Sequence, residues 1–446
     1  MGSLPADAHY PDASDRSLVL THPTAAEKEQ TWRLNHGEWG GPLDLATYLE
    51  REPFLASTPL AADGGMLHWI LTDASPAQST AQNEKRRVLA SCETIRKRVL
   101  YVSRSGGEVR EGLGYGIGSV YTYPEFRGKK YAARMLRELG VVLKTWPEEE
   151  HLRKKDSQTR GQDNGASDGS RPGEQSNAQT KLQMAESKEA VCSALWSDIG
   201  KRFYASKGWP VFASGHVEFP SSSLSSLPGI CSLLEQSAQP HKTSLTLAPV
   251  NTSNLAQLCA EDEAQIRAEL VQHARETHRT AFAFAPEYDA SEVRGMIATV
   301  TNPTNGAAEP DATKAEEKTR MWAVWTRNYG ADAASNPAQN TLYILRLVID
   351  NTGTAPSDAK ALQLAFDAVL HSALDAARTW HCGAVHLWNP TPAVRALIAG
   401  SGVAHRFVDR EVDSIPSMMW YGPDGAKNEK EEDAVDWIAN EKYCWC

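Results

Sequence analysis

GSVYTYPEFRGKKYAARMLRELG, residues 118–140, decides the fold of this chain because it reads as a strand, a loop and a helix. A short apolar strand ends at Thr122, and after a proline turn a helix begins whose buried side carries Met135 and Leu139. The loop between them can hold a pyrophosphate. Small residues let the backbone approach closely, the helix N-terminus attracts anions, and Arg127 and two lysines add positive charge.

This loop differs from the common nucleotide-binding loops. It has no GxxxxGK[ST] pattern, and the upstream glycines at 112, 114, 116 and 118 alternate as in a strand. Residues 127–132, RGKKYA, instead resemble [RQ]xxGxA, the coenzyme A loop of the GCN5-related N-acetyltransferase (GNAT) superfamily, with Lys130 in place of the middle glycine. An ordinary basic turn is the alternative. The resemblance implies that acetyl-CoA is the cofactor (a co-substrate), bound by Val120, Tyr121, Thr122, Arg127, Gly128, Lys129, Lys130, Tyr131, Ala132 and Ala133.

The composition indicates at least two domains. The 446 residues are 41% hydrophobic and include 13 Trp and 13 Tyr, enough for two or three cores. No apolar run approaches the roughly 18 residues that span a bilayer, and the first residues lack the basic and apolar regions of a secretory signal. We therefore expect a cytoplasmic protein with no membrane partner.

The cysteine content and the net charge further limit the metals, nucleic acids and substrates that the chain is expected to bind. The 7 cysteines are scattered, which is typical of reduced thiols, and Cys444 and Cys446 have no further ligands at metal spacing, so we expect no metal. The net charge is -10 and no basic stripe is interleaved with aromatics, so nucleic acid is not an expected partner. An acidic chain is compatible with a small cationic substrate.

The pattern along the chain predicts two domains of one kind. Residues 1–22 are polar and expected to be flexible. A catalytic GNAT domain is expected over 23–220, with strands at 66–72, 86–93, 113–122, 191–196 and 210–218 and a disordered insertion over 147–188. A linker over 221–243 precedes a second domain, 244–446, with the same order of elements and a closing strand at 418–421.

The second domain is expected to lack the coenzyme A loop. Its counterpart, residues 350–358 (DNTGTAPSD), has no Arg or Lys and carries two Asp, which would repel a pyrophosphate. An unrelated α/β domain is the alternative. The predicted fold class is therefore α/β (α+β): a GNAT fold with a mixed central sheet flanked by helices, followed by a second GNAT-like domain.

A second motif supports the resemblance. Residues 197–209, SDIGKRFYASKGW, fit the family pattern [AG]xxFYxxxGF at Phe203, Tyr204, Gly208 and Trp209, on a helix expected over 199–207 that Asp198 would cap. The resemblance places Tyr204 beside the thioester sulfur, where a protonated phenol can act as the acid for the departing thiolate. The alternative is a packed aromatic residue. Many relatives have an Asn that contacts pantetheine at the position of Ser197, so the resemblance implies that Ser197 is a further coenzyme-binding residue.

Acyl transfer to an amine also needs an oxyanion donor and a base. We expect the donor to be a backbone N–H near Tyr121, where the fourth and fifth strands diverge. A lysine-type amine has a pKa of about 10.4 and must lose a proton before it attacks. Glu93 is the first candidate base, and Glu218 and His216 follow; a polar residue on the sheet surface is the alternative for each. No Cys lies in either motif, which favours direct attack in a ternary complex.

Several segments are similar to the fungal lysine N6-acetyltransferases of lysine catabolism: NHGEWG at 35–40, YLERE at 48–52, WILTD at 69–73, SDIGKRFY at 197–204 and NEKY at 440–443. This similarity implies acetyl transfer to lysine or a related small amine. It also implies that His36, Glu38 and Trp39 lie over the acceptor site; a capped helix turn is the alternative. A protein or peptide N-acetyltransferase and a non-catalytic acyl-CoA-binding scaffold remain as alternatives, and the sequence leaves the acceptor and the oligomeric state open.

Overall fold

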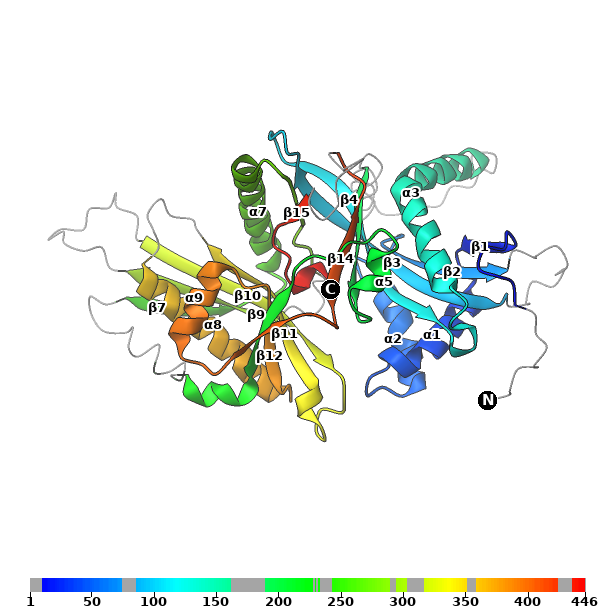
Figure 1. The fold of residues 1–446 in the computed structure, drawn as a ribbon. Coiled ribbons are helices and arrows are strands. Elements are labelled where there is room, and N and C mark those ends of the chain that lie inside the picture. Colours follow the sequence, from blue (N-terminus) through cyan, green and yellow to red (C-terminus); the bar gives the residue numbers. More distant parts are fainter. Residues whose placement is uncertain are drawn as a thin grey trace. The chain divides into compact units, whose positions relative to one another are not determined.

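The computed structural model describes residues 10–73, 86–161, 189–227, 229, 232, 243–288, 294–302, 317–350, 358–423 and 435–445 (Figure 1). The chain divides into two compact units. Unit 1 consists of Met1–Phe212, Arg267–Ala285 and Val412–Ile438, and unit 2 of Ala213–Ile266, Pro286–Glu411 and Ala439–Cys446. Among the described residues, no helix is both long enough and apolar enough to cross a membrane.

Unit 1 is built on a mixed sheet in the order β1-β2-β3-β4-β5-β14, with β8 beside the far half of β3 and β15 beside β8. The pairs from β1 to β4 are antiparallel, whereas β4 and β5 are parallel and are joined by the crossover helix α3. The strands are β1 Leu18–Thr21, β2 Met66–Asp73, β3 Val88–Val102, β4 Arg110–Thr122, β5 Ala190–Ser197, β8 Thr280–Phe284, β14 Ile415–Trp420 and β15 Val435–Trp437.

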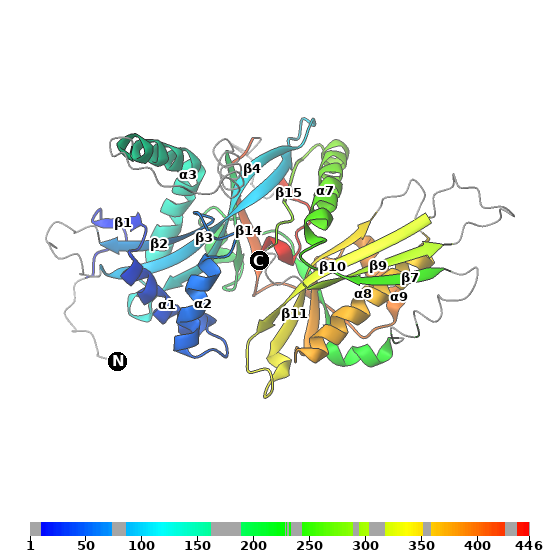
Figure 2. The same ribbon diagram turned by 180° about the vertical axis from the view of Figure 1, so that it is seen from behind.

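Helices cover both faces of this sheet (Figure 2). Alternate residues of a strand point to opposite faces, and β2 shows this directly: the Trp69 ring meets Trp146 of α3, whereas the His68 ring meets Trp32 of α1. α3 buries Met135 and Leu139 among other residues against the first face. The helices are α1 Ala25–Trp39, α2 Leu45–Ala56, the short η1 Pro124–Phe126, α3 Tyr131–Gly161 and α5 Arg202–Ala205.

Unit 2 repeats the plan with a sheet in the order β13-β6-β12-β11-β10-β9-β7. β11 and β12 are parallel and joined by the crossover helix α8, as β4 and β5 are joined by α3. The strands are β6 Gly215–Pro220, β7 Ser244–Pro249, β9 Gly295–Asn302, β10 Glu317–Tyr329, β11 Asn340–Asp350, β12 Ala384–Trp388 and β13 Arg406–Asp409. The helices are η2 Ser221–Ser226, η4 Pro337–Gln339, α8 Ala359–Thr379, α9 Pro392–Ser401 and η5 Lys442–Cys444, and α7 Leu255–Thr277 contributes to both units.

The core of unit 2 lies between its sheet and α8. Buried alanines such as Ala365 and Ala373 let α8 approach the strands closely, while Phe366 and Leu374 fill the space beside them. From η2, Leu224 packs against this core too. Both units thus confirm the predicted architecture of a mixed sheet flanked by helices.

Two strands belong to a different sheet from the one that their sequence position suggested. β6 was expected to close the sheet of the catalytic domain over 23–220, but it pairs with β12 and β13 in unit 2. The closing strand at 418–421 was assigned to the domain over 244–446, but β14 pairs with β5 in unit 1. The sheet of unit 2 therefore takes β6 from the N-terminal half of the chain, and the sheet of unit 1 takes β8, β14 and β15 from the C-terminal half, which corrects both predicted boundaries.

The segments expected to be flexible are partly ordered. Within 1–22, β1 pairs with β2, and Ala13 and Leu18 are buried in unit 1; residues 1–9 lie outside the described part of the chain. Of the insertion at 147–188, residues up to Gly161 continue α3, and 162–188 are not described. The expected linker at 221–243 begins with η2, because Leu224 and Leu227 offer apolar surface to the core of unit 2.

The helix expected over 199–207 is shorter. α5 has 4 residues, Arg202–Ala205, and its N-cap residue is Lys201. Gly200 has a φ of 79°, which interrupts the helix, and Asp198 does not cap it because its carboxylate accepts a hydrogen bond from the Ser414 backbone N–H at 2.8 Å. The predicted N-cap role of Asp198 is therefore wrong.

Candidate active site

The turn between β4 and α3 has the conformation that a phosphate loop requires. Gly128 and Lys130 have φ values of 79° and 66°, so both occupy the left-handed region that favours glycine. Space beside Gly128 is open, because an added Cβ would meet nothing within 4 Å. The first N–H groups of α3 have no partner within the helix and are free to meet an anion.

The side chains of this loop divide into two sets. Arg127 is half exposed, donates to the Thr122 carbonyl at 3.1 Å and lies 3.6 Å from Glu38. Lys129 is exposed too and lies over the ring of Tyr10. Tyr131 is buried instead, and its hydroxyl donates to the Pro11 carbonyl at 2.6 Å. Its side chain anchors the N-terminal segment, so only its backbone remains for a coenzyme.

β4 and β5 separate where the sequence analysis expected them to. Their pairing ends at Ile117 and Leu195, although β4 continues to Thr122 and β5 to Ser197. At the same level β4 carries a bulge against β3, with Ser119 and Val120 opposite the single residue Cys92. Beyond Ile117, the edge of β4 on the side of β5 therefore has no paired strand. The oxyanion donor remains a prediction for this stretch.

Glu93 lies beside this bulge and is hydrogen-bonded through both carboxylate oxygens. Oε1 is 3.1 Å from Nδ1 of His68, its cross-strand partner on β2, and Oε2 accepts a hydrogen bond from the Ser119 hydroxyl at 2.8 Å. Ser119 has a φ of 51°, and the bulge directs its hydroxyl to the carboxylate. Burial alone would raise the pKa of Glu93, but His68 and Ser119 hold the pKa below its ordinary value.

A small pocket opens beside this group. Its volume is about 10 Å³, which is about enough for one water molecule. Nε2 of His68 is buried and has no hydrogen-bond partner among the described residues. The lining includes residues from α1, β2, β3 and β4, among them Thr31, Asn35, His68, Cys92, Glu93 and Ser119.

Tyr204 is buried close to this region. Burial raises its pKa well above the usual value, and the nearby Asp198 and Cys92 raise it further. The phenol therefore stays protonated at neutral pH and keeps a proton to donate. The rest of its motif is packed: Trp209 is fully buried and donates to Ser193 at 3.0 Å, and a Cβ at Gly208 would lie 2.4 Å from Met419 of β14.

Unit 2 has a matching break between β11 and β12, but a carboxylate of the chain occupies it. The pairing ends at Ile344 and Leu387, although β11 continues to Asp350. Beyond the break, the Leu347 N–H donates to Glu441 at 3.1 Å. Glu441 also pairs with Arg346, which binds Asp262 at 2.7 Å. Residues 351–357, where the acidic counterpart of the coenzyme loop was expected, lie outside the described residues.

A comparison with known protein families found a match in the C-terminal part of the chain. Residues 232–446 match the family described as the LYC1 GNAT-like C-terminal domain. The C-terminal part of the chain is therefore similar to a GNAT-like domain. With the crossover of β4, α3 and β5 before it, the chain has a GNAT fold followed by a second, GNAT-like domain. No curated protein sequence matches the chain.

Solved structures that the chain matches include acyltransferases. A GCN5-related N-acetyltransferase from Kribbella flavida is 14% identical, with 90% of this chain and 70% of that chain covered and a TM-score of 0.43. A tandem GNAT protein from the clavulanic acid biosynthesis pathway is 12% identical, with 91% and 98% covered and a TM-score of 0.40. Saccharomyces cerevisiae N-myristoyltransferase, solved with myristoyl-CoA, is 10% identical, with 93% and 83% covered and a TM-score of 0.42.

The remaining predicted residues of the GNAT site lie in more ordinary surroundings. Ser197 is buried and donates to the Gly200 carbonyl at 2.7 Å, so its hydroxyl holds the turn before α5. Nε2 of His36 lies 2.8 Å from the Leu43 carbonyl, which fixes the link between α1 and α2. Glu38 and Trp39 are exposed, and the Trp39 ring meets Tyr121 edge-on at 5.6 Å. These contacts place Glu38 and Trp39 beside β4 and the coenzyme loop.

Two alternative bases belong to the other unit. Glu218 and His216 lie on β6, which is part of the sheet of unit 2 and does not close the GNAT sheet of unit 1. His68 is the residue that sequence reasoning missed. A lone histidine in MLHWILT reads as a packed core residue, and its pairing with Glu93 follows only from the register of β2 on β3. Ser119 was missed because its role depends on the bulge.

Proposed function

We propose that unit 1 catalyses acetyl transfer from acetyl-CoA to the amine of a small molecule, with lysine or a related amino acid or amine as the expected acceptor. The observation that carries this proposal is the hydrogen-bonded group of Glu93, His68 and Ser119 beside the break between β4 and β5. A base is needed at this place, because the amine must reach the thioester carbonyl with its lone pair free.

The hydrogen bonds assign different roles to Glu93 and His68. Both carboxylate oxygens of Glu93 already accept hydrogen bonds, one from His68 and one from Ser119. A carboxylate acceptor places the imidazole proton on Nδ1, which leaves the lone pair on Nε2 toward the pocket. We therefore assign His68 as the base and Glu93, the first candidate from the sequence, as the residue that positions it.

The reaction then proceeds by direct attack. His68 Nε2 takes a proton from the acceptor amine, and the amine nitrogen forms a bond to the thioester carbonyl carbon. A backbone N–H of β4 beyond Ile117 stabilises the oxyanion. When the carbon–sulfur bond breaks, Tyr204 gives its proton to the thiolate. The amide nitrogen loses its remaining extra proton, which restores the Tyr204 phenol, and His68 releases the first proton to solvent. Because the pocket is small, α1, which lines it, must move away from the sheet before an acceptor can enter.

Thiol release tests the proposal. The full chain is incubated with acetyl-CoA and a panel of lysine, ornithine, polyamines, peptides and other amines, and free coenzyme A thiol is measured. We expect release with a small amine, a slower rate in Tyr204→Phe with acetyl-CoA binding retained, and no change in Tyr101→Phe, another buried tyrosine of unit 1. Absence of release with every amine would reject the proposal, and release with peptides alone would favour a protein N-acetyltransferase.

A further inference from the structure

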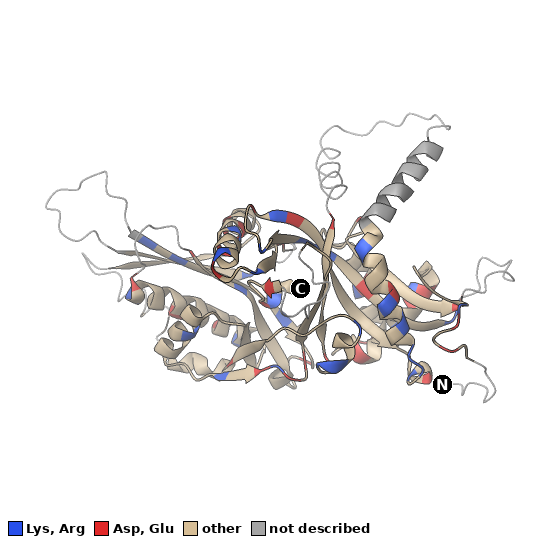
Figure 3. Ribbon diagram, turned by 45° about the horizontal axis from the view of Figure 1, so that its top comes forward, with Lys and Arg blue, Asp and Glu red and all other residues tan. Residues whose placement is uncertain are grey.

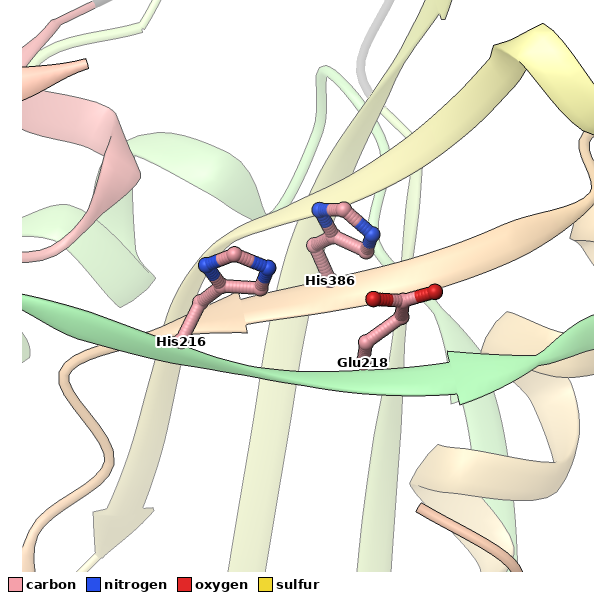
Figure 4. A group of neighbouring side chains, drawn as sticks. All are labelled: His216, Glu218 and His386. Atoms are coloured by element: carbon pink, nitrogen blue, oxygen red, sulfur yellow. The ribbon is translucent and has the colours of Figure 1, made fainter. Parts of the chain in front are cut away.

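A second group of ionisable side chains lies in unit 2 and has no part in the proposed reaction. His216 and Glu218 alternate on β6, and His386 of β12 is the direct cross-strand partner of Glu218. The three side chains lie on the same face of the sheet (Figure 4). Their neighbours Val217 and Val385 face the opposite side and belong to the core under α8. Both strands are paired on each side, so the backbone holds these positions firmly.

The distances suit a shared ligand. One possible ligand atom from each of the three side chains lies within 4.8 Å of the others. The imidazole rings are stacked, with centroids 4.5 Å apart and planes inclined by 25°. In a tetrahedral zinc site, ligand atoms about 2.1 Å from the metal are about 3.4 Å from each other. Side-chain rotations of about 1 Å would therefore bring the three atoms onto one cation.

An unpaired ring nitrogen also suits a cation. Nδ1 of His216 is buried and has no hydrogen-bond partner among the described residues, which leaves one ring nitrogen to be satisfied.

Two arginines limit which cation fits. Arg406 pairs with Glu218 at 2.6 Å, but its side chain is 72% exposed, so a metal can displace it at small cost. Arg410 is buried against the Trp388 ring, and its charge opposes any cation nearby. Because Arg410 weakens the binding of any cation, the site favours metals that imidazole binds strongly, namely zinc, cobalt, nickel or copper. Calcium and magnesium prefer oxygen ligands.

We propose that His216, His386 and Glu218 form a binding site for a divalent transition-metal cation of the zinc class in unit 2. Three protein ligands leave one coordination position open to water. The site links β6 to β12, the two strands that supply its ligands. The proposal does not depend on acetyl transfer, because every ligand lies in unit 2.

Cobalt spectroscopy tests the site directly. The full chain, made without a polyhistidine tag, is stripped with a chelator, titrated with Co²⁺ and followed by its visible d–d absorption, and Zn²⁺ is then added. We expect one equivalent of Co²⁺ to give the band of a tetrahedral nitrogen and oxygen site and Zn²⁺ to abolish it. His216→Gln and His386→Gln should each weaken binding by at least about 100-fold, since even residues behind metal ligands are worth about 10–100-fold.

Two further variants keep the test decisive. His405→Gln alters another histidine of unit 2 outside the group and should leave the band unchanged. Arg406→Gln removes an exposed cation from Glu218 and should tighten Co²⁺ binding, and it remains informative if the histidine variants fail to fold. The absence of a band in the native chain, equal bands in all histidine variants, or weaker binding in Arg406→Gln would each overturn the proposal.

Discussion

At the scale of single residues, His68 carries the strongest prediction for catalysis. His68→Gln removes the proposed base, so we expect kcat to fall by about 10²- to 10⁴-fold, the usual contribution of general base catalysis. Acetyl-CoA binding should be unchanged. The measurement is thiol release as a function of pH. The defect should shrink as the pH rises toward 10, because more of the acceptor amine then loses its proton unaided.

The matched variant for His68 is Glu93→Gln, which keeps a group that can orient the imidazole through its amide oxygen. We expect a smaller loss than in His68→Gln. The reverse order, with Glu93→Gln inactive and His68→Gln nearly unaffected, would show that Glu93 itself accepts the proton, as the sequence analysis first supposed.

Glu27 carries a prediction for stability. It is buried at the start of α1, where Thr24 and Glu27 form a capping box and Arg86 pairs with the carboxylate at 2.7 Å. Burial opposes the charged form, but these partners lower the pKa of Glu27 to about 2. A lowered carboxylate pKa stabilises the fold above the unfolded value of about 4.5, and this contribution is lost as the pH falls toward 2.

We therefore expect Glu27→Gln to destabilise unit 1 by roughly 3 kcal/mol at pH 7, with the difference disappearing as the pH approaches 2. Urea unfolding followed at pH 7 and pH 3 measures this change. Glu29→Gln is the control, because the pair of Glu29 with Arg33 is half exposed and contributes little. A loss that stays constant with pH would mean that packing of the side chain, and not its charge, is responsible.

At the scale of elements, the coenzyme loop explains why the family pattern has glycine where this chain has Lys130. Lys130 has a φ of 66°, a conformation that costs a side-chain-bearing residue about 1 kcal/mol or more. The loop holds the glycine-like conformation without the glycine. The departure that supported a non-catalytic scaffold is therefore no obstacle to the shape of the loop.

Lys130→Gly should relieve this strain. We expect the free energy of unfolding to rise by about 1 kcal/mol. The KM for acetyl-CoA should change little, because the loop loses only one exposed charge and keeps Arg127 and Lys129. Lys129→Gly is the control: it also removes a lysine but lies outside the left-handed region, so it should bring no gain. Equal effects of the two substitutions would show that charge, and not backbone conformation, dominates this loop.

The C-terminal element of unit 2 depends on Glu441. This carboxylate accepts from the Leu347 N–H and pairs with Arg346, and both residues are buried. Glu441→Ala leaves a buried guanidinium and a buried N–H with fewer partners. We expect a loss of about 3–5 kcal/mol in the stability of unit 2, measured by urea unfolding. Glu441→Gln should lose less, since its amide oxygen can still accept from Leu347, and an equal loss would show that the charge is essential.

Sequence reasoning succeeded for elements whose signals are local. The crossover helix that follows the loop at 127–132 is set by neighbouring residues, and the structure confirms it. Sequence reasoning failed for contacts that depend on the register of two strands or on a β-bulge. His68 meets Glu93 only because β2 pairs with β3 in one particular register, and Ser119 reaches Glu93 only from its bulge. No local pattern encodes either contact.

At the scale of the whole molecule, both units are assembled from distant parts of one chain. Acidic and basic residues are interspersed along the described ribbon (Figure 3), so no block of one charge marks a boundary between them. The sequence predicted two domains of similar plan but drew one boundary near residue 243. β6 alternates apolar and polar residues and β14 is mostly apolar, and neither pattern is specific to one sheet, so only the tertiary pairing decides which sheet each joins.

This exchange predicts how the chain responds to division. A chain ending at residue 243 lacks β8, β14 and β15, which leaves β5 and the far half of β3 each with an unpaired edge. We expect it to aggregate or to unfold without cooperativity, as judged by gel filtration and thermal melting. Supplying residues 244–446 as a separate chain in the same cell should restore a folded complex, because all strands are then present. A monomeric, cooperatively folded fragment ending at 243 would show that unit 1 does not need the strands it receives from the C-terminal half.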